Sequence, residues 1–171
     1  MPVSFAMYVL GHSVAIWTFV AFYAQYQRRI LGNLAQPVML LSLSVVEWAT
    51  FSAVEIAIPV PELKFVSHNL KYIGMLGASV TGLLFVLYYV NKNDGLTRRR
   101  LNLLLTMPAI TLVMAVTNPF HHLMWSDLRL VSFGEVVAVQ ETLGLWGWVY
   151  VFYAFIIIFA ALIILFQYLR N

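Results

Sequence analysis

The chain contains no cysteine, which excludes disulfide bonds and thiol chemistry and leaves the redox compartment undetermined. Charged residues are also scarce, at 10% of 171 residues, whereas hydrophobic residues make up 62%. No Rossmann fingerprint, P-loop, HExxH zinc motif or nucleophile elbow is present. A soluble domain of this length could not bury so much apolar surface. The composition therefore predicts a membrane protein that is not an enzyme.

Five apolar stretches are long enough to cross a bilayer, whose hydrocarbon core needs roughly 20 helical residues. They lie at about 3–27, 34–58, 62–90, 99–117 and 143–167. Because they occupy most of the chain, we predict an all-α polytopic membrane helix bundle that forms one transmembrane domain over residues 1–171. The loop before the last stretch alternates partly and contains Phe133-Gly134-Glu135, which predicts a small β-hairpin over 126–141.

Basic residues gather in the loops that follow the first, third and fifth stretches. These loops hold seven of the ten Lys and Arg residues, namely Arg28, Arg29, Lys92, Arg98, Arg99, Arg100 and Arg170. By the positive-inside rule, the N-terminus lies outside and the C-terminus lies in the cytoplasm. We therefore expect a multi-pass protein of the cell membrane. The net charge of +3 reflects anchoring in the lipid bilayer and not nucleic-acid binding.

Ionisable residues within the second and third stretches need partners, because a charge at membrane depth is costly. If these stretches fold as a helical hairpin about residue 60, Lys71 lies within a turn of Glu47, and Glu55 lies near Lys64 and His68. A Glu47–Lys71 pair could fix helix register, line a pocket open to the outside, or act as an ion relay in a transporter or channel subunit. A neutral Glu47 bonded to a backbone carbonyl is a further alternative.

The histidines raise the alternative of a haem or metal site. His12 and His68 lie at similar depth on different helices, as axial haem ligands would. His121 and His122 would need further ligands from the outer loop to hold zinc. Hydrogen-bonded histidines account for the same pattern, and we predict neither a metal nor another cofactor.

Four segments between about residues 40 and 160 follow one another in a recognisable order. They are the aromatic-then-acid stretch 48–55, Leu70-Lys71-Tyr72-Ile73-Gly74 leading into 84–89, Thr117-Asn118-Pro119-Phe120-His121-His122-Leu123-Met124-Trp125, and the aromatic stretch 144–154. This order resembles the N-terminal seven-transmembrane sensor region of membrane histidine kinases, here in a truncated version with five spans. The resemblance implies a receptor-like input module of a two-component system. Such a module binds a small ligand or stimulus from the extracytoplasmic side and relays it to a separate output partner.

Polar and aromatic residues near the outer ends of the second, third and fifth stretches supply the predicted ligand site. Its candidate residues are Glu47, Glu55, Asn69, Lys71, Tyr72, Asn118, His121, His122, Trp125 and Trp146. The tryptophans also fit an interfacial aromatic belt. The expected partners are the lipid bilayer, a small molecule, a cytoplasmic signalling protein and a second copy of the chain. No phospho-accepting histidine box or ATP site is present, so kinase activity is not carried over from the resemblance.

Overall fold

The computed structural model describes residues 3–90 and 97–170, which are mostly helical. Their elements are α1 (Val3–Tyr26), α2 (Arg28–Leu31), the 3-10 turn η1 (Gly32–Leu34), α3 (Ala35–Ala57), α4 (Pro61–Val90), α5 (Arg98–Val116), α6 (Asn118–His121), β1 (Trp125–Phe133), β2 (Val136–Leu143) and α7 (Leu145–Arg170). Among these residues, five helical segments are long and apolar enough to cross a membrane. The predicted fold class, a polytopic helix bundle with a small β-hairpin, is confirmed.

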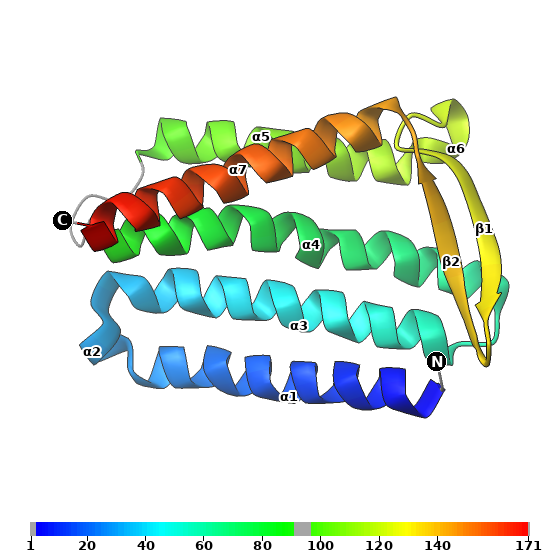
Figure 1. The fold of residues 1–171 in the computed structure, drawn as a ribbon, viewed down its shortest axis with the longest axis horizontal. Coiled ribbons are helices and arrows are strands. Elements are labelled where there is room, and N and C mark those ends of the chain that lie inside the picture. Colours follow the sequence, from blue (N-terminus) through cyan, green and yellow to red (C-terminus); the bar gives the residue numbers. More distant parts are fainter. Residues whose placement is uncertain (1–2, 91–96, 171) are drawn as a thin grey trace.

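The long helices form two layers that run along one axis (Figure 1). The helices α1, α3 and α4 lie side by side, and α5 and α7 pack on α4. The strands β1 and β2 cross one end of the bundle and contact the ends of α3, α4 and α7. The hairpin therefore touches the three helices that surround the predicted ligand site.

Small residues bring α4 close to α3. A Cβ added to Gly74 would collide with the Ser44 carbonyl oxygen and lie 2.7 Å from the Trp48 amide nitrogen. A Cβ on Gly77 would lie 2.6 Å from Ser44 Oγ, whereas one on Gly82 would meet nothing within 4 Å. Close approach of the two helices thus depends on the first two glycines, as small residues permit in membrane helices. Gly82 faces open space instead.

The hairpin is antiparallel and its register pairs Phe133 with Val136 and Trp125 with Leu143. Its two-residue turn contains Gly134 at φ 67°, a conformation that glycine adopts without steric cost. Only Gly144 separates the end of β2 from the start of α7. The Gly144 amide donates to the Met124 carbonyl at 2.9 Å, so this joint is bonded to the chain just before β1.

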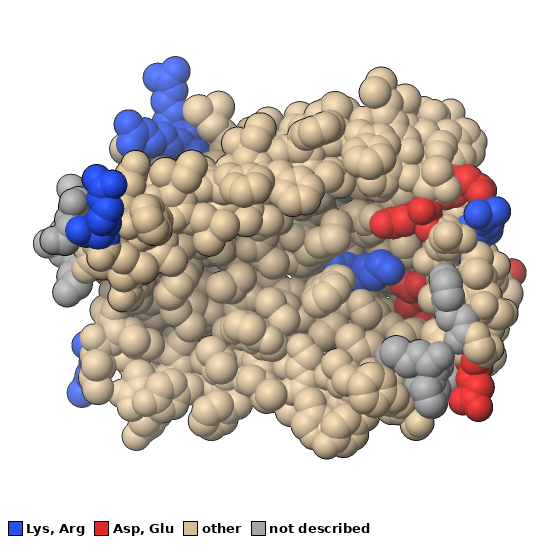
Figure 2. All heavy atoms as spheres, in the orientation of Figure 1, with Lys and Arg blue, Asp and Glu red and all other residues tan. Residues whose placement is uncertain are grey.

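The two ends of the bundle differ in charge (Figure 2). Lys and Arg side chains cluster at the end where α7 finishes, while Asp and Glu side chains gather at the hairpin end. The positive-inside rule assigns the basic end to the cytoplasm and the hairpin to the outside. The predicted orientation and the fold therefore agree.

Candidate functional site

A cluster of polar side chains lies where the hairpin covers the outer ends of α3 and α4. We call it the outer polar cluster and define it as Glu55, His68, Lys71, Tyr72, Trp125 and Glu141. Its members come from α3, α4, β1 and β2. The cluster therefore joins four elements that are distant in sequence.

Glu55 is the buried anion of the cluster, with a side chain only 4% exposed. Its Oε2 accepts a hydrogen bond from Lys71 Nζ at 2.7 Å and lies 3.5 Å from His68 Nδ1. Its Oε1 accepts the backbone N–H of Val139 in β2 at 2.9 Å. Both carboxylate oxygens are engaged, which offsets the cost of burying the charge. One side chain thus binds α3 to both α4 and the hairpin.

A second chain of contacts runs through Glu141 on β2. The Tyr72 hydroxyl donates to Glu141 Oε2 at 2.6 Å, and the Trp125 indole N–H donates to the Tyr72 oxygen at 3.3 Å. The same Oε2 lies 2.9 Å from His68 Nε2. His68 is 1% exposed and therefore sits between two carboxylates, those of Glu55 and Glu141. A histidine in this position couples its protonation to both carboxylates.

Lys64 ties the hairpin to the helices beside the cluster. Its ammonium donates to the carbonyls of Glu55 at 2.6 Å, Ile56 at 3.3 Å and Val137 at 2.8 Å. The residue is 3% exposed. The last α3 carbonyls have no helical partner of their own, so this cation also caps the end of α3.

Glu141 and Lys71 are the charged members of the cluster that are partly exposed. Their side chains are 33% and 21% exposed. Burial raises the pKa of Glu141, but the neighbouring His68 and Tyr72 side chains outweigh it, so its pKa lies below the ordinary value. Glu141 is therefore an anion at neutral pH, partly open to molecules outside the membrane.

The predicted Glu47–Lys71 pair is wrong, because Lys71 pairs with Glu55. The Glu47 carboxyl instead lies against Gly74, and both of its buried oxygens lack a hydrogen-bond partner among the described residues. A long lysine side chain extends toward the polar membrane surface, which explains why it reaches the outer carboxylate. The proposed Glu47–Lys71 ion relay therefore has no structural basis in this form.

Asn118, His121 and His122 lie in the segment that precedes the hairpin and are not members of the outer polar cluster. The Asn118 side chain accepts the N–H groups of Met124 and Trp125 at 2.9 and 3.0 Å and donates to the Trp125 carbonyl at 3.0 Å. His121 Nε2 lies 2.9 Å from Thr117 Oγ1, and its Nδ1 accepts the Leu123 N–H at 3.0 Å. His122 is exposed and ends α6 with φ 54°.

The remaining predicted residues also have separate environments. Trp146 donates its indole N–H to Thr111 Oγ1 on α5 at 3.2 Å. The Asn69 side-chain oxygen is buried without a hydrogen-bond partner among the described residues. Of the ten predicted ligand-site residues, the structure thus brings Glu55, Lys71, Tyr72 and Trp125 together.

The haem geometry is not formed. His12 is exposed on α1 and bonds the Tyr8 carbonyl at 2.8 Å, whereas His68 is buried on α4, on the other side of α3 (Figure 1). Among residues 3–90 and 97–170, no group of three His, Cys, Asp or Glu side chains is arranged to hold a metal ion. The chemistry that this site offers is proton transfer and charged hydrogen bonding.

The sequence-based site omitted His68, Lys64 and Glu141. The fold-back near residue 60 nevertheless placed Lys64 and His68 near Glu55, as the structure has them. The position of Glu141 depends on how the hairpin docks, which local patterns do not fix. A signal for Glu141 was nevertheless present, because it shares the inward face of β2 with Val139 and Leu143 at the strand period of two. A carboxylate among apolar residues on such a face indicates a buried partner.

The membrane helix bundle described above agrees with the comparison with known protein families. The family described as the N-terminal 7TM region of histidine kinase matches residues 9–171, which include every helix that forms the cluster. Neither the curated proteins nor the solved structures gave a significant match. The chain is therefore a multi-pass protein of the cell membrane, and it belongs to the family of N-terminal membrane sensor regions of histidine kinases.

Proposed function

We propose that this chain binds a small polar ligand at the outer polar cluster and relays its binding through α7 to a separate cytoplasmic signalling protein. The observation that carries the proposal is the position of Glu141. It lies in the cluster on β2, and β2 leads into α7 through the single residue Gly144. A change at Glu141 therefore acts directly on the helix that reaches the basic end.

Two members of the cluster are placed to meet a ligand. Glu141 and Lys71 are partly exposed and of opposite charge, whereas Glu55 and His68 are nearly inaccessible. A ligand with both a donor and an acceptor group would compete for these two side chains. It would thereby weaken the contacts of Glu141 with Tyr72 and His68, which hold β2 in place.

Relay requires that the ligand favour one arrangement of the hairpin over another. Charged hydrogen bonds hold the docked arrangement: Lys64 donates to the Val137 carbonyl, Glu55 accepts the Val139 N–H, and Glu141 accepts from the Tyr72 hydroxyl. Such bonds are directional and are lost over short displacements. These bonds therefore favour a switch between two positions over a gradual deformation of the hairpin contact.

The absence of cysteine makes a direct test feasible. Cysteines introduced at the exposed positions Asn102 on α5 and Gln167 on α7 carry spin labels near the basic end. The test compares label-to-label distances, by pulsed electron paramagnetic resonance in nanodiscs, between the labelled parent and Glu141→Gln. Because this change weakens the Tyr72 and His68 contacts, we expect the distance distribution to shift.

The matched control is Glu62→Gln, which removes an exposed carboxylate from the first turn of α4 outside the cluster. It should leave the distances unchanged. Equal distributions in Glu141→Gln, Glu62→Gln and the parent would contradict a relay through α7. A second arm screens polar metabolites against the parent protein for the same shift. No metabolite should shift the distances once Glu141 and Lys71 are both replaced.

A further inference from the structure

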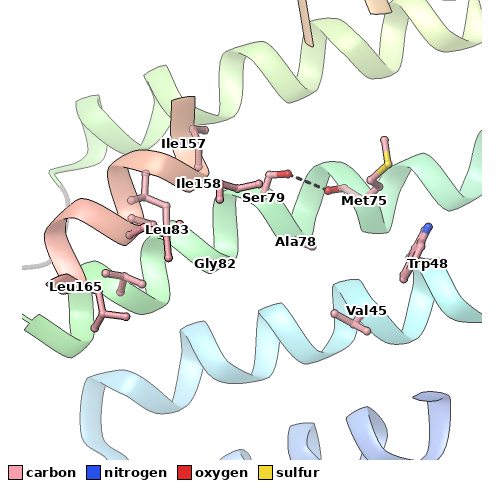
Figure 3. A pocket seen from close by; sticks show the side chains of 13 residues that line it. Val45, Trp48, Met75, Ala78, Ser79, Gly82, Leu83, Ile157, Ile158 and Leu165 are labelled. Atoms are coloured by element: carbon pink, nitrogen blue, oxygen red, sulfur yellow. Dashed lines mark hydrogen bonds between the residues drawn. The ribbon is translucent and has the colours of Figure 1, made fainter. Parts of the chain in front are cut away.

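A long apolar groove runs along α4 between α3 and α7, on the membrane-embedded part of the bundle (Figure 3). Its volume is about 480 Å³, within the range of small-molecule sites. Val45 and Trp48 of α3 line one wall, and Ile157, Ile158 and Leu165 of α7 line the other. Ser79 is the one hydroxyl-bearing side chain among the lining residues, and it bonds the carbonyl of Met75 on its own helix.

The groove has a defined floor on α4. Met75, Ala78 and Gly82 follow one another at helical spacing, and the floor extends to Val86. From Met75 to Val86 the helix rises about 17 Å at 1.5 Å per residue. The space above Gly82 is empty, since an added Cβ there meets no atom within 4 Å. The groove is therefore long enough for an extended hydrocarbon chain.

A charged residue stands at the outer end of the same stripe. Lys71 precedes Met75 by four residues and so lies one turn nearer the outside on the same face of α4. The charged residues of α4 are Glu62, Lys64 and Lys71, and the stretch 72–90 that follows carries none. Lys71 thus lies at the boundary between the charged and the uncharged part of this candidate membrane-spanning helix.

The charge balance at this boundary leaves Lys71 with donors to spare. Its ammonium carries three N–H groups, and one bonds Glu55 in the part of the chain that the structure describes. Glu55 also binds Val139, and Glu141 accepts from Tyr72, so both acids already have partners in the cluster. A carboxylate at Lys71 would use donors that neither acid occupies.

We infer that this groove binds a single-chain anionic amphiphile, a long-chain carboxylate, with its tail along α4 and its head group at Lys71. The two halves of the site match the two halves of such a molecule. The tail meets an almost wholly apolar groove, and the carboxylate meets a partly exposed ammonium one helical turn beyond the groove residue Met75. This binding does not depend on the relay proposed above.

Photolabelling of the full chain in phosphatidylcholine nanodiscs tests the site. The probe is a palmitate that carries a diazirine in its tail, with unlabelled palmitate as competitor. We expect competable labelling on α3, α4 and α7 at groove residues, and no competable labelling of α1. Hexadecanol, which has the same tail and no charge, should compete at least tenfold less well than palmitate.

Two adjacent substitutions provide matched controls. Gly82→Leu places a side chain in the groove at a position where an added Cβ has free space, and it should weaken palmitate binding tenfold or more. Thr81→Leu changes the neighbouring residue, which lines a different depression between α3, α4 and α5, and should leave binding unchanged. Lys71→Gln should reduce the preference for palmitate over hexadecanol, and Lys71→Arg should preserve it.

Several results would overturn the inference. One is competable labelling spread over all lipid-facing helices, which would indicate bulk lipid contact only. Another is equal loss of binding in Gly82→Leu and Thr81→Leu. Equal competition by palmitate and hexadecanol would remove Lys71 from the site. Competition by excess phosphatidylcholine as strong as that by palmitate would show that ordinary bilayer lipid fills the groove.

Discussion

The outer and inner halves of the α3–α4 pair hold together by different means. In the outer half, Glu55, Lys64 and Lys71 make charged hydrogen bonds that fix α3, α4 and the hairpin in one geometry. In the inner half, α3 and α4 still meet closely at Ser44 and Gly77, but with α7 they also line an apolar groove in which Gly82 borders open space. Directional bonds specify position, whereas a loosely filled apolar surface accepts an occupant. Under the two proposals above, the outer half would read the stimulus and the inner half would hold the lipid tail.

The strongest test of this contrast is Glu55→Ala. The change leaves the Lys71 ammonium and the Val139 N–H without their partner inside the protein. Removing one member of a buried pair costs about 3 kcal/mol or more. We expect a loss of this size in the free energy of unfolding, measured in a nonionic detergent. A loss below about 1 kcal/mol would mean that the cluster does not fix the outer half.

A second test separates close packing from open space on one helix. Gly74→Ala places a methyl group against the α3 backbone and should cost about 1–3 kcal/mol through overpacking. Gly82→Ala has room for the methyl group and should stabilise by up to about 1 kcal/mol, because alanine favours helix. Thermal unfolding of the two variants beside the parent measures whether each change raises or lowers the stability. Equal destabilisation would contradict the inferred difference in packing.

A third test uses pH and the exposed carboxylate of the cluster. The pKa of Glu141 is depressed below its ordinary value of 4.5 by its partners in the folded chain. Its contribution to stability is therefore complete above pH 4.5 and is lost as the pH falls through the lowered folded value. We expect the unfolding temperature of the parent to fall over this range more steeply than that of Glu141→Gln. The Glu62→Gln variant should follow the parent.

The smallest expected effect comes from the second carboxyl on α3. Glu47 oxygens have no hydrogen-bond partner among the described residues, so Glu47→Gln removes no bond. The change in unfolding free energy should stay within about 1 kcal/mol. Glu55→Gln, at a carboxylate with three partners, should cost more than Glu47→Gln. The reverse order would show that Glu47, and not Glu55, is the structural anion.

The fold class and the orientation followed from the sequence because bilayer thickness and loop charge act locally along the chain. The hairpin was also predictable, since its turn residues and alternation are local. The outer polar cluster was only partly predictable from the sequence. The folding point near residue 60 correctly placed Lys64 and His68 near Glu55 but wrongly placed Lys71 within a turn of Glu47. Depth along the helix axes does not account for the reach of a long lysine side chain. The contacts of Glu141 required knowledge of how β2 docks on helices about seventy residues earlier in the chain.

The single-residue joint at Gly144 has a geometric consequence. Because β2 ends at Leu143 and α7 starts at Leu145, a rotation of the hairpin about this joint would also rotate α7. The 26 residues of α7 extend about 39 Å at 1.5 Å per residue. Pivoting at its outer end by about 5° would sweep Arg170 sideways by roughly 3 Å, since arc length is radius times angle. A small rotation at the outer surface would thus produce a larger sideways movement on the opposite side of the membrane.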